Sequence, residues 1–466
     1  MTAARRLDRL YCDRALLADG WASGVLLRFD AQGLIAGLEA GLDAPPPGVV
    51  ERAAGPVIPG MPNLHSHAFQ RAMAGLTERA GPAEDSFWTW REVMYGFVGR
   101  IDPDSLQAVA AMAYAEMLER GYTSVAEFHY LHHDTDGRPY ADVAETSKRI
   151  LAAADATGIG LTHLPVLYAQ GGFGGQPAGE GQRRFLNDPD RLLAIVEACR
   201  AAAGGHRTGL ALHSLRAVSP DAMAAALDGL SALDPAAPVH IHVAEQTAEV
   251  DACLAWSGRR PVEWLLDRGW LGPSWCLVHA THVTPDEVAG IAASGAVAGL
   301  CPTTEADLGD GLFPARDFLS QGGRFGVGSD SQVIIDAAEE LRLLEFGQRL
   351  AARRRNLLAP EAGASTGAAL YRAAVAGGAQ ALGLPGPAGG LATGQRADLV
   401  VLNLDDPRLY GRNDDMLLDS YVFAGARDAV RDVVAGGRLV VRDGRHVDAD
   451  AIRNGWRHAV DRLNAA

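Results

Sequence analysis

The sequence contains few cysteines and a single lysine. Five cysteines are spread over 466 residues, and no two of them form a C-x-x-C pair. This spacing disfavours both a disulfide framework and a zinc site built from thiolates, so we interpret the cysteines as reduced core residues. Lys148 is the only lysine among 42 basic residues, so nearly all positive charge lies on guanidinium groups. The cysteines are Cys12, Cys199, Cys253, Cys276 and Cys301.

Long apolar runs and long basic runs are also missing. No uncharged apolar stretch approaches the roughly 18 residues of a membrane span, and the N-terminal residues lack a signal-peptide core, so we expect a cytoplasmic location. The 57 acidic residues outnumber the 42 basic ones, and the formal net charge is −15. Because the longest basic run is the three arginines at 353–355, we expect no nucleic-acid partner and no membrane partner.

The length and patterning indicate a large core with a second, smaller module. Hydrophobic residues make up 48% of the chain. From residue 57 onward, short apolar runs alternate with Ala- and Leu-rich segments of helical period, which is typical of repeated β/α units around a parallel sheet. The eight strands that we expect are 57–65, 123–128, 161–168, 208–215, 239–245, 275–282, 296–301 and 324–330.

Helical segments separate these strands, for example 103–121, 188–203 and 284–295. The last of them opens with Thr284 followed three residues later by Glu287, the pattern of a capping box. Eight strands, each followed by a helix, predict the α/β class and a closed (β/α)8 TIM-like barrel over residues 57–388. The alternative is a doubly wound sheet, but no G-x-G-x-x-G motif opens a helix after the first strand.

The two flanks have a different pattern. Residues 1–56 and 389–466 contain short β-rich runs broken by Gly and Asp, and the second flank ends in a helix. Two terminal β segments around a barrel pair most simply with each other. We therefore predict one small β-sandwich domain formed by both termini.

Polar residues gather where the expected barrel strands end. In such a barrel the carboxyl ends of the strands face the active site. His65 and His67 lie two residues apart on an extended chain, so both imidazoles point the same way. The other residues at these ends are His213, His242, Glu245, His279 and Asp330.

A set of imidazoles and one carboxylate at one barrel mouth suits a metal. A single histidine at a strand end is more often a hydrogen-bonded core residue, but His65, His67, His242 and Asp330 would arrive together, and this set suits Zn²⁺ or Fe²⁺. Bound Zn²⁺ lowers the pKa of its water to about 7. His279 is either a fourth histidine ligand or a group that stabilises developing charge, and we prefer the second reading.

Glu245 follows His242 by three residues, just past the end of the fifth strand. A glutamate there can simply stabilise a helix N-terminus. Beside a metal-activated water, the same carboxylate can shuttle the proton that hydrolysis of a C=N bond requires.

The motifs resemble those of the amidohydrolase superfamily: "NLHSH" on strand one, "HIHVAE" on five, "LVHATH" on six and "GVGSDS" on eight. In two-metal members of that superfamily a carboxylated lysine on strand three or four bridges the ions. Here Lys148 lies on an expected helix, so the resemblance implies one metal ion, Zn²⁺ or Fe²⁺. The spacing of His242 and Glu245 further resembles the deaminase branch, in which the Glu protonates the leaving nitrogen.

Within that branch the chain resembles the formiminoglutamate deiminases, through "NLHSHAFQRAMAGLTE", "FWTWREVMY", "EFHYLHH", "ALHSLRAVS", "HIHVAEQ" and "CPTTEADLGDG". The resemblance implies a place in histidine degradation, with Glu245, His279 and Asp330 as catalytic residues. The metal ligands that it implies are His65, His67, His242 and Asp330, and the substrate contacts are Gln70, Arg91, Tyr130, His213 and Arg216.

The chemistry of such a substrate agrees with these residues. It carries two carboxylates and a cationic formimino group, and guanidinium binds carboxylate with a planar fork. Arg91 and Arg216 are placed to anchor the substrate carboxylates. Taken singly, each arginine is more simply interpreted as part of a surface ion pair. The alternatives are a deaminase of guanine, cytosine or an adenosine derivative, and a catalytically silent scaffold protein.

Three further features stay open. The segment 68–100 is long for a βα connection and carries Phe87, Trp88 and Trp90, which suits a lid over the site or a contact between subunits. The histidines at 129, 132 and 133 suggest a second metal, but we prefer solvent or network roles. Barrels of this size commonly pair through symmetric faces, so we predict a homodimer.

Overall fold

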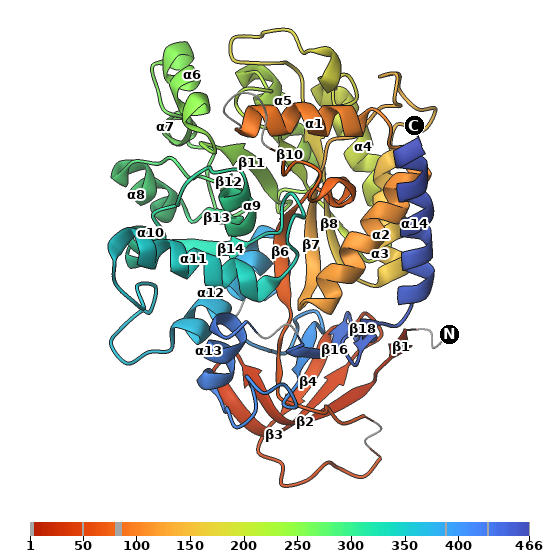
Figure 1. The fold of residues 1–466 in the computed structure, drawn as a ribbon, viewed down its shortest axis with the longest axis vertical. Helices are drawn as coiled ribbons and strands as arrows, with labels where there is room; N and C mark the ends of the chain where they lie inside the picture. Colours follow the sequence, from red (N-terminus) through yellow and green to blue (C-terminus); the bar gives the residue numbers. More distant parts are fainter. Residues whose placement is uncertain (1–3, 49–50, 80–85, 387–388, 426–427, 466) are drawn as a thin grey trace.

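The computed structural model describes residues 4–48, 51–79, 86–386, 389–425 and 428–465. Most of the chain forms a barrel of parallel strands surrounded by helices, and both ends of the chain contribute to a second sheet beneath it (Figure 1). The architecture confirms the predicted fold class of a (β/α)8 barrel with a smaller β unit.

The barrel strands run parallel and close on themselves, since the third strand pairs with both parts of the fourth. Nearly all their residues are buried, as expected where one face meets the barrel interior and the other meets helices. The fourth strand is divided at Gly209, where a Cβ atom would lie 2.3 Å from the carbonyl oxygen of Pro238. The strands are β6 (Met61–Ser66), β7 (Tyr122–His129), β8 (Gly160–Leu167), β9 (Arg207–Thr208), β10 (Leu210–Leu212), β11 (Val239–Val243), β12 (Trp275–His279), β13 (Val297–Leu300) and β14 (Arg324–Val327).

Several barrel helices begin with the same local signal, a polar N-cap followed by proline. Asp102, Asp188, Ser219 and Thr284 each accept a hydrogen bond from the first turn, and proline follows each of them. The capping box of Thr284 and Glu287 is present as predicted. The barrel region contains η1 (Ala68–Met73), α1 (Phe87–Val98), α2 (Pro103–Glu119), α3 (Glu145–Thr157), η2 (Glu180–Gln182), α4 (Pro189–Ala202), α5 (Pro220–Leu233), α6 (Thr247–Ser257), α7 (Pro261–Leu266), α8 (Pro285–Ser294), α9 (Pro302–Asp307), α10 (Ala315–Ser320), α11 (Ala337–Ala352) and α12 (Thr366–Ala381).

The second sheet takes strands from both ends of the chain in the order β1, β17, β16, β15, β5, β2, β3, β4, with β18 paired to β17. A separate cluster of buried apolar side chains, including Val25, Leu27 and Leu399, forms its own core. The strands are β1 (Arg5–Arg6), β2 (Arg9–Leu17), β3 (Gly20–Phe29), β4 (Ile35–Glu39), β5 (Val57–Pro59), β15 (Leu399–Leu402), β16 (Val430–Ala435), β17 (Arg438–Arg442) and β18 (Arg445–His446); the helices α13 (Asp415–Phe423) and α14 (Ala449–Ala465) complete the chain.

Two details differ from the simplest reading of the sequence. The expected first strand is two strands, because the chain passes from the second sheet (β5) into the barrel (β6) at Gly60, where a Cβ atom would lie 2.2 Å from the Thr123 side chain. The terminal helix α14 packs along α2, and Arg100 donates to the carbonyl oxygen of Leu463 at 3.0 Å (Figure 1). We propose that the barrel unit starts at this glycine; its predicted end at residue 388 lies outside the described residues.

All five cysteines are buried and unpaired, in agreement with their interpretation as core residues. Across the described parts of the chain, none of the helices combines the length and the apolar character that a membrane span requires.

Candidate active site

The first and last barrel strands bring His65, His67 and Asp330 together. The backbone N–H of His67 donates to the carbonyl oxygen of Asp330 at 3.1 Å, and the N–H of Asp330 donates to that of His65 at 3.0 Å. Gly328 permits this approach, since a Cβ there would lie 2.8 Å from the backbone of His65. Asp330 itself has a left-handed backbone with φ 43°, a strained conformation of the kind that clusters at functional sites.

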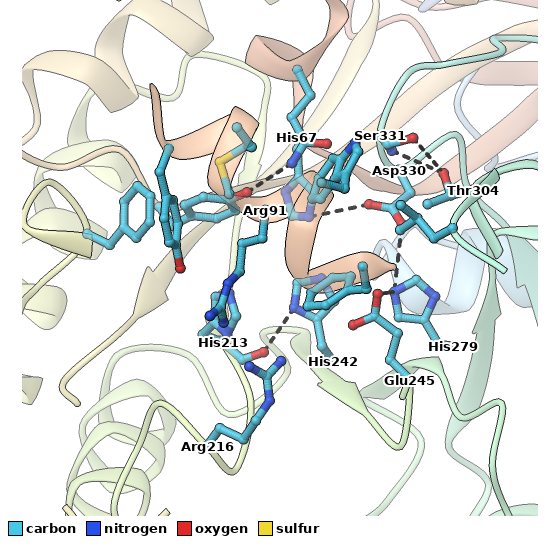
Figure 2. Close-up of a pocket in the computed structure, with 18 of the residues that line it drawn as sticks. His67, Arg91, His213, Arg216, His242, Glu245, His279, Thr304, Asp330 and Ser331 are labelled. Carbon is cyan, nitrogen blue, oxygen red and sulfur yellow. Dashed lines mark hydrogen bonds and ion pairs between the residues drawn. The ribbon is translucent and has the colours of Figure 1, made fainter. Parts of the chain in front are cut away.

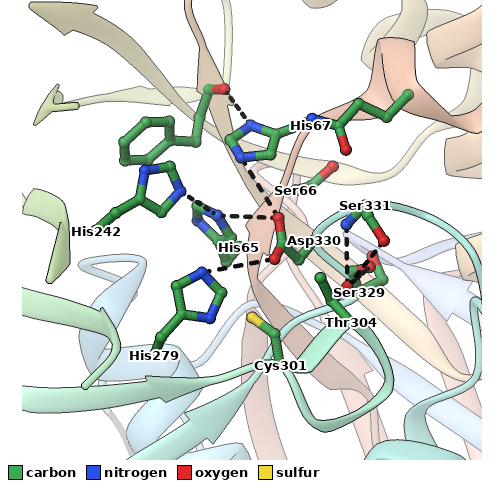
Figure 3. A network of polar contacts seen from close by, with 12 residues as sticks. His65, Ser66, His67, His242, His279, Cys301, Thr304, Ser329, Asp330 and Ser331 are labelled. Carbon is green, nitrogen blue, oxygen red and sulfur yellow. Dashed lines mark hydrogen bonds and ion pairs between the residues drawn. The ribbon is translucent and has the colours of Figure 1, made fainter. Parts of the chain in front are cut away.

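The side chains of His65, His67 and His279 surround the carboxylate of Asp330 (Figure 3). Nε2 of His65 lies 3.0 Å from Nε2 of His242, and Oδ1 of Asp330 lies 3.4 Å from Nε2 of both His65 and His67. Two groups have ligand atoms within 4.8 Å of one another: one is His65, His67 and His242, and the other is His65, His279 and Asp330. All these side chains are buried.

The hydrogen bonds behind these rings fit a cation at their centre. Nδ1 of His67 donates to the carbonyl oxygen of Phe128 at 2.9 Å, and Nδ1 of His242 donates to that of His213 at 3.0 Å. Each Nε2 therefore presents a lone pair, and the one on His67 faces a carboxylate oxygen. Electron-rich atoms at this distance are stabilised by a cation between them, and carbonyl contacts of this kind orient metal-binding imidazoles.

Burial keeps these imidazoles neutral. It lowers the pKa of His65 to about 3, and it lowers the pKa values of His67 and His242 as well. Burial also opposes ionisation of Asp330, but the neighbouring histidines outweigh it and lower its pKa. A set of neutral imidazoles with one ionised carboxylate is ready to hold a divalent ion without first losing protons.

His279 lies among three carboxylates. Its Nε2 is 3.8 Å from Glu245 and 3.7 Å from Asp330, and its Nδ1 is 3.3 Å from Glu305. Burial alone would lower the pKa of His279, but the carboxylates, Glu245 foremost, raise it to about 10. Its backbone is also left-handed, with φ 68°. The carboxylates therefore favour the protonated form of this ring, whereas burial favours the neutral form of the imidazoles beside it.

Glu245 is a buried carboxyl group of the pocket and is suited to move a proton. Burial raises its pKa to about 7, although His279 acts in the opposite direction. Its backbone N–H donates to Glu249 at 3.2 Å, which fixes the turn at the end of β11. A carboxyl group with a pKa near neutrality can accept and donate a proton in one catalytic cycle.

A pocket extends from this centre to the inner surface of α1. Figure 2 shows Arg91 and Arg216 on one side of it and Glu245 and His279 on the other, with His242 between them. The site residues expected from the sequence line it, apart from His65, which lies beneath. The lining comprises His67, Gln70, Phe87, Trp90, Arg91, Met94, Tyr95, Tyr130, Tyr168, Phe185, His213, Arg216, His242, Glu245, His279, Thr304, Leu308, Asp330 and Ser331.

The two arginines lack acidic partners among the residues with described positions. Their Nε atoms are buried and make no hydrogen bond to the described residues. Nearby, Nε2 of Gln70 donates to the Tyr130 hydroxyl at 3.0 Å, and the Oε1 atom of Gln70 has no partner among the same residues. The far end of the pocket therefore holds buried donors and one buried acceptor without a hydrogen-bond partner in the described part of the chain.

Sequence reasoning gave no role to several residues of the site. Glu305, Thr304 and Ser331 lie beside His279 and Asp330, and the Thr304 and Ser331 hydroxyls are 2.9 Å apart. Tyr168 packs its ring against His213, with 4.5 Å between the ring centroids. The stretch "CPTTEADLGDG" contains Thr304 and Glu305 and was a visible signal for both. Nothing in the local sequence indicated which of its side chains turn toward the site.

The histidines after the second strand do not join this centre. His132 and His133 donate to backbone carbonyls at 2.9 and 2.5 Å, and His129 contacts Thr146 at 3.1 Å. Among the residues with assigned positions, both candidate metal groups lie at the barrel mouth. Of the segment 68–100, η1 and α1 cover the pocket, while residues 80–85 lie outside the described part of the chain.

A closed parallel barrel with three histidines and an aspartate at its mouth defines a class of metal-dependent hydrolases. A model of the amidohydrolase family matches residues 57–440, and this chain belongs to that family. It is 57% identical over 442 residues to a formimidoylglutamate deiminase of Pseudomonas aeruginosa, covering 94% of this chain and 96% of that protein.

Other proteins and solved structures are also similar to this chain. A 5-methylthioadenosine/S-adenosylhomocysteine deaminase of Natronomonas pharaonis is 29% identical, with 88% of each chain covered. An amidohydrolase structure from Brucella melitensis has a TM-score of 0.91 and 50% identity, covering 98% of this chain and 99% of that one. A zinc-bound adenosine deaminase from Xanthomonas campestris has a TM-score of 0.78 at 22% identity and 98% coverage of both, which shows the shared fold.

Proposed function

We propose that this enzyme hydrolyses N-formimino-L-glutamate to N-formyl-L-glutamate and ammonia, as a step in histidine degradation. The observation that carries the proposal is the division of charge in the pocket. At one end, Arg91 and Arg216 have no acidic partner among the described residues, and Glu245 and Asp330 lie at the other (Figure 2). A substrate with carboxylates and a cationic amidine matches both ends. The 57% identity to a formimidoylglutamate deiminase supports the same substrate.

We propose His65, His67, His242 and Asp330 as the ligands of one divalent ion, Zn²⁺ or Fe²⁺. Three imidazoles and one carboxylate accept either metal, and Zn²⁺ is our first choice. When bound, such an ion acidifies a coordinated water to a pKa of about 7 and so supplies a nucleophile at neutral pH.

The protein side chains then carry the protons. Asp330 accepts a proton as water attacks the formimino carbon. Protonated Glu245 delivers its proton to the nitrogen that leaves as ammonia, and the resulting carboxylate takes the remaining hydroxyl proton as the formyl carbonyl forms. The positively charged His279 stabilises the negative charge that develops on the attacking oxygen. We propose that Arg91, Arg216, His213, Gln70 and Tyr130 bind the carboxylate-bearing part of the substrate and hold the amidine carbon near Glu245.

The decisive experiment measures ammonia release from N-formimino-L-glutamate by the metal-loaded enzyme, beside guanine, cytosine and N-formyl-L-glutamate. We expect release from the first compound and none from the other three. Release from guanine or cytosine alone would favour the nucleobase deaminase instead. No release from any of the four compounds, together with a metal analysis that finds no retained ion, would favour the silent scaffold.

The homodimer and the cytoplasmic location remain predictions. Exposed apolar side chains on α11, Phe346 and Leu350, at 36% and 80% exposure, are candidates for a subunit contact. Light scattering on the purified protein tests the first prediction, and cell fractionation tests the second.

A further inference from the structure

A single indole, that of Trp88, lies within cation–π distance of both pocket arginines. The Cζ atom of Arg91 is 4.6 Å from the centroid of the Trp88 ring, and that of Arg216 is 5.6 Å from it. Arg91 also approaches the ring of Tyr95 at 5.4 Å. Since Trp88 belongs to α1 and Arg216 follows β10, the indole joins two walls of the pocket that are far apart in the sequence.

The contact with Trp88 bears on the electrostatics of this end of the pocket. Two guanidinium groups that approach one ring repel each other, and neither has an acidic partner among the side chains with described positions. A carboxylate partner would hold them in place but would also neutralise them and occupy their N–H donors. An aromatic face attracts a cation through its quadrupole. It does not take up the hydrogen bonds along the edge of the guanidinium group, so the N–H donors stay available.

The local structure fixes where the indole lies. Ser86 caps α1, and its Oγ accepts from the backbone N–H of Trp88 at 3.3 Å. The buried ring of Phe87 packs edge-on against Trp88, with 5.1 Å between centroids. Arg91 follows Trp88 by three residues, so both side chains share one face of the helix.

We propose that Trp88 is a positioning residue that holds Arg91 and Arg216 ready for a substrate carboxylate, and thereby selects anionic formimino compounds over neutral ones. The inference deepens the proposed function and rests on it for the identity of the substrate. Trp88 touches the arginines rather than the reacting atoms. Its loss should therefore weaken binding of anionic ligands more than it slows the chemical step.

The test compares Trp88→Leu with Trp88→Phe, and it uses Trp256→Leu as the matched control. Trp256 lies on α6, outside the residues that line the pocket, and packs against Phe173; no cation–π contact joins it to an arginine in the described structure. For Trp88→Leu we expect the KM for N-formimino-L-glutamate to rise about tenfold, the size of two such contacts. We expect kcat to change less than threefold, and Trp88→Phe to restore much of the lost affinity.

A binding arm separates this inference from the proposed function. Calorimetric titration of the metal-loaded proteins with glutarate should show weaker binding by Trp88→Leu than by wild type or Trp256→Leu. Equal glutarate affinity and equal KM in Trp88→Leu and wild type would overturn the inference, as would losses of the same size in both leucine variants. A wild type that binds glutarate but releases no ammonia from N-formimino-L-glutamate would overturn the proposed function and leave the glutarate comparison to decide the role of Trp88.

Discussion

Nδ1 of His279 lies 3.3 Å from a carboxylate oxygen of Glu305, on the side of the ring opposite Glu245. The same oxygen of Glu305 accepts from the backbone N–H of Cys301 at 2.9 Å, so α9 holds the carboxylate in place. The contact fixes Nδ1 as a donor and directs Nε2 toward Glu245 and Asp330. Glu305 therefore orients His279 and contributes, after Glu245, to raising its pKa.

Replacement of Glu305 by Gln should lower kcat without removing the metal. The amide keeps an acceptor for Cys301 but removes one of the negative charges that raise the pKa of His279. We expect kcat to fall by about 10- to 100-fold, the usual effect of losing a partner behind a functional histidine. Steady-state kinetics and metal analysis check this. An unchanged kcat would show that His279 needs no such support.

Replacement of Glu245 by Gln should leave metal binding nearly intact and remove most turnover. The amide has nearly the same shape but cannot move a proton. We expect kcat to fall by a factor on the order of 10² to 10⁴, the contribution of one acid–base group. Ammonia release and metal content are measured on the same sample. Normal turnover would mean that another group carries the proton.

Replacement of Arg216 by Met should weaken binding of N-formimino-L-glutamate selectively. The methionine keeps apolar bulk and loses the charged donors, and hydrogen bonds to charged groups contribute about 1.5–3 kcal/mol each. We expect the KM to rise by about 10- to 100-fold. The matched control is Arg191→Met, on the outer helix α4. Equal effects of the two variants would contradict a carboxylate-binding role for Arg216.

The stability of the protein should depend on pH through Glu127. Burial raises the pKa of this carboxyl to about 7, even though Ser66, Ala68 and Tyr114 donate to it. Because the unfolded value is about 4.3, the native state binds the extra proton between these values. The contribution of Glu127 to the free energy of unfolding therefore falls as pH rises from about 4.3 to 7.

Melting temperatures measured from pH 5 to 8 test this dependence. Glu127→Gln cannot ionise, so the melting temperature of wild type relative to this variant should decline across that range. Glu116→Gln, which loses an ion pair with Arg71 on the outside of the barrel, serves as the control. Parallel curves for wild type and Glu127→Gln would mean that Glu127 has an ordinary pKa.

Removal of the metal should abolish activity reversibly. The ligand atoms of His65, His67 and His242 lie within 4.8 Å of one another, as do those of His65, His279 and Asp330, and we propose no other source of an activated water. Dialysis against a chelator should stop ammonia release, and about one equivalent of Zn²⁺ per chain should restore it. Full activity after exhaustive chelation, verified by metal analysis, would contradict the proposed mechanism.

The sequence alone determined the barrel and the chemistry of its mouth. Alternating apolar runs and helical periods recur locally, so they predict strands and helices without knowledge of the fold. A strand end is also a local feature, and the parallel order brings all carboxyl ends to one side. His65, His67, His242 and Asp330 could therefore be proposed as ligands before the structure. In the structure, His65 groups with His67 and His242, and it also groups with His279 and Asp330.

Only the tertiary structure decided which distant side chains meet. No period in the sequence indicates that Gly60 transfers the chain between two sheets, that Glu305 turns toward His279, or that Trp88 reaches Arg216. The left-handed backbone at His279 and Asp330 is likewise held by surrounding contacts. Local propensity fixes the elements, but the closure of the barrel and the docking of α1 on its mouth fix the distances between them.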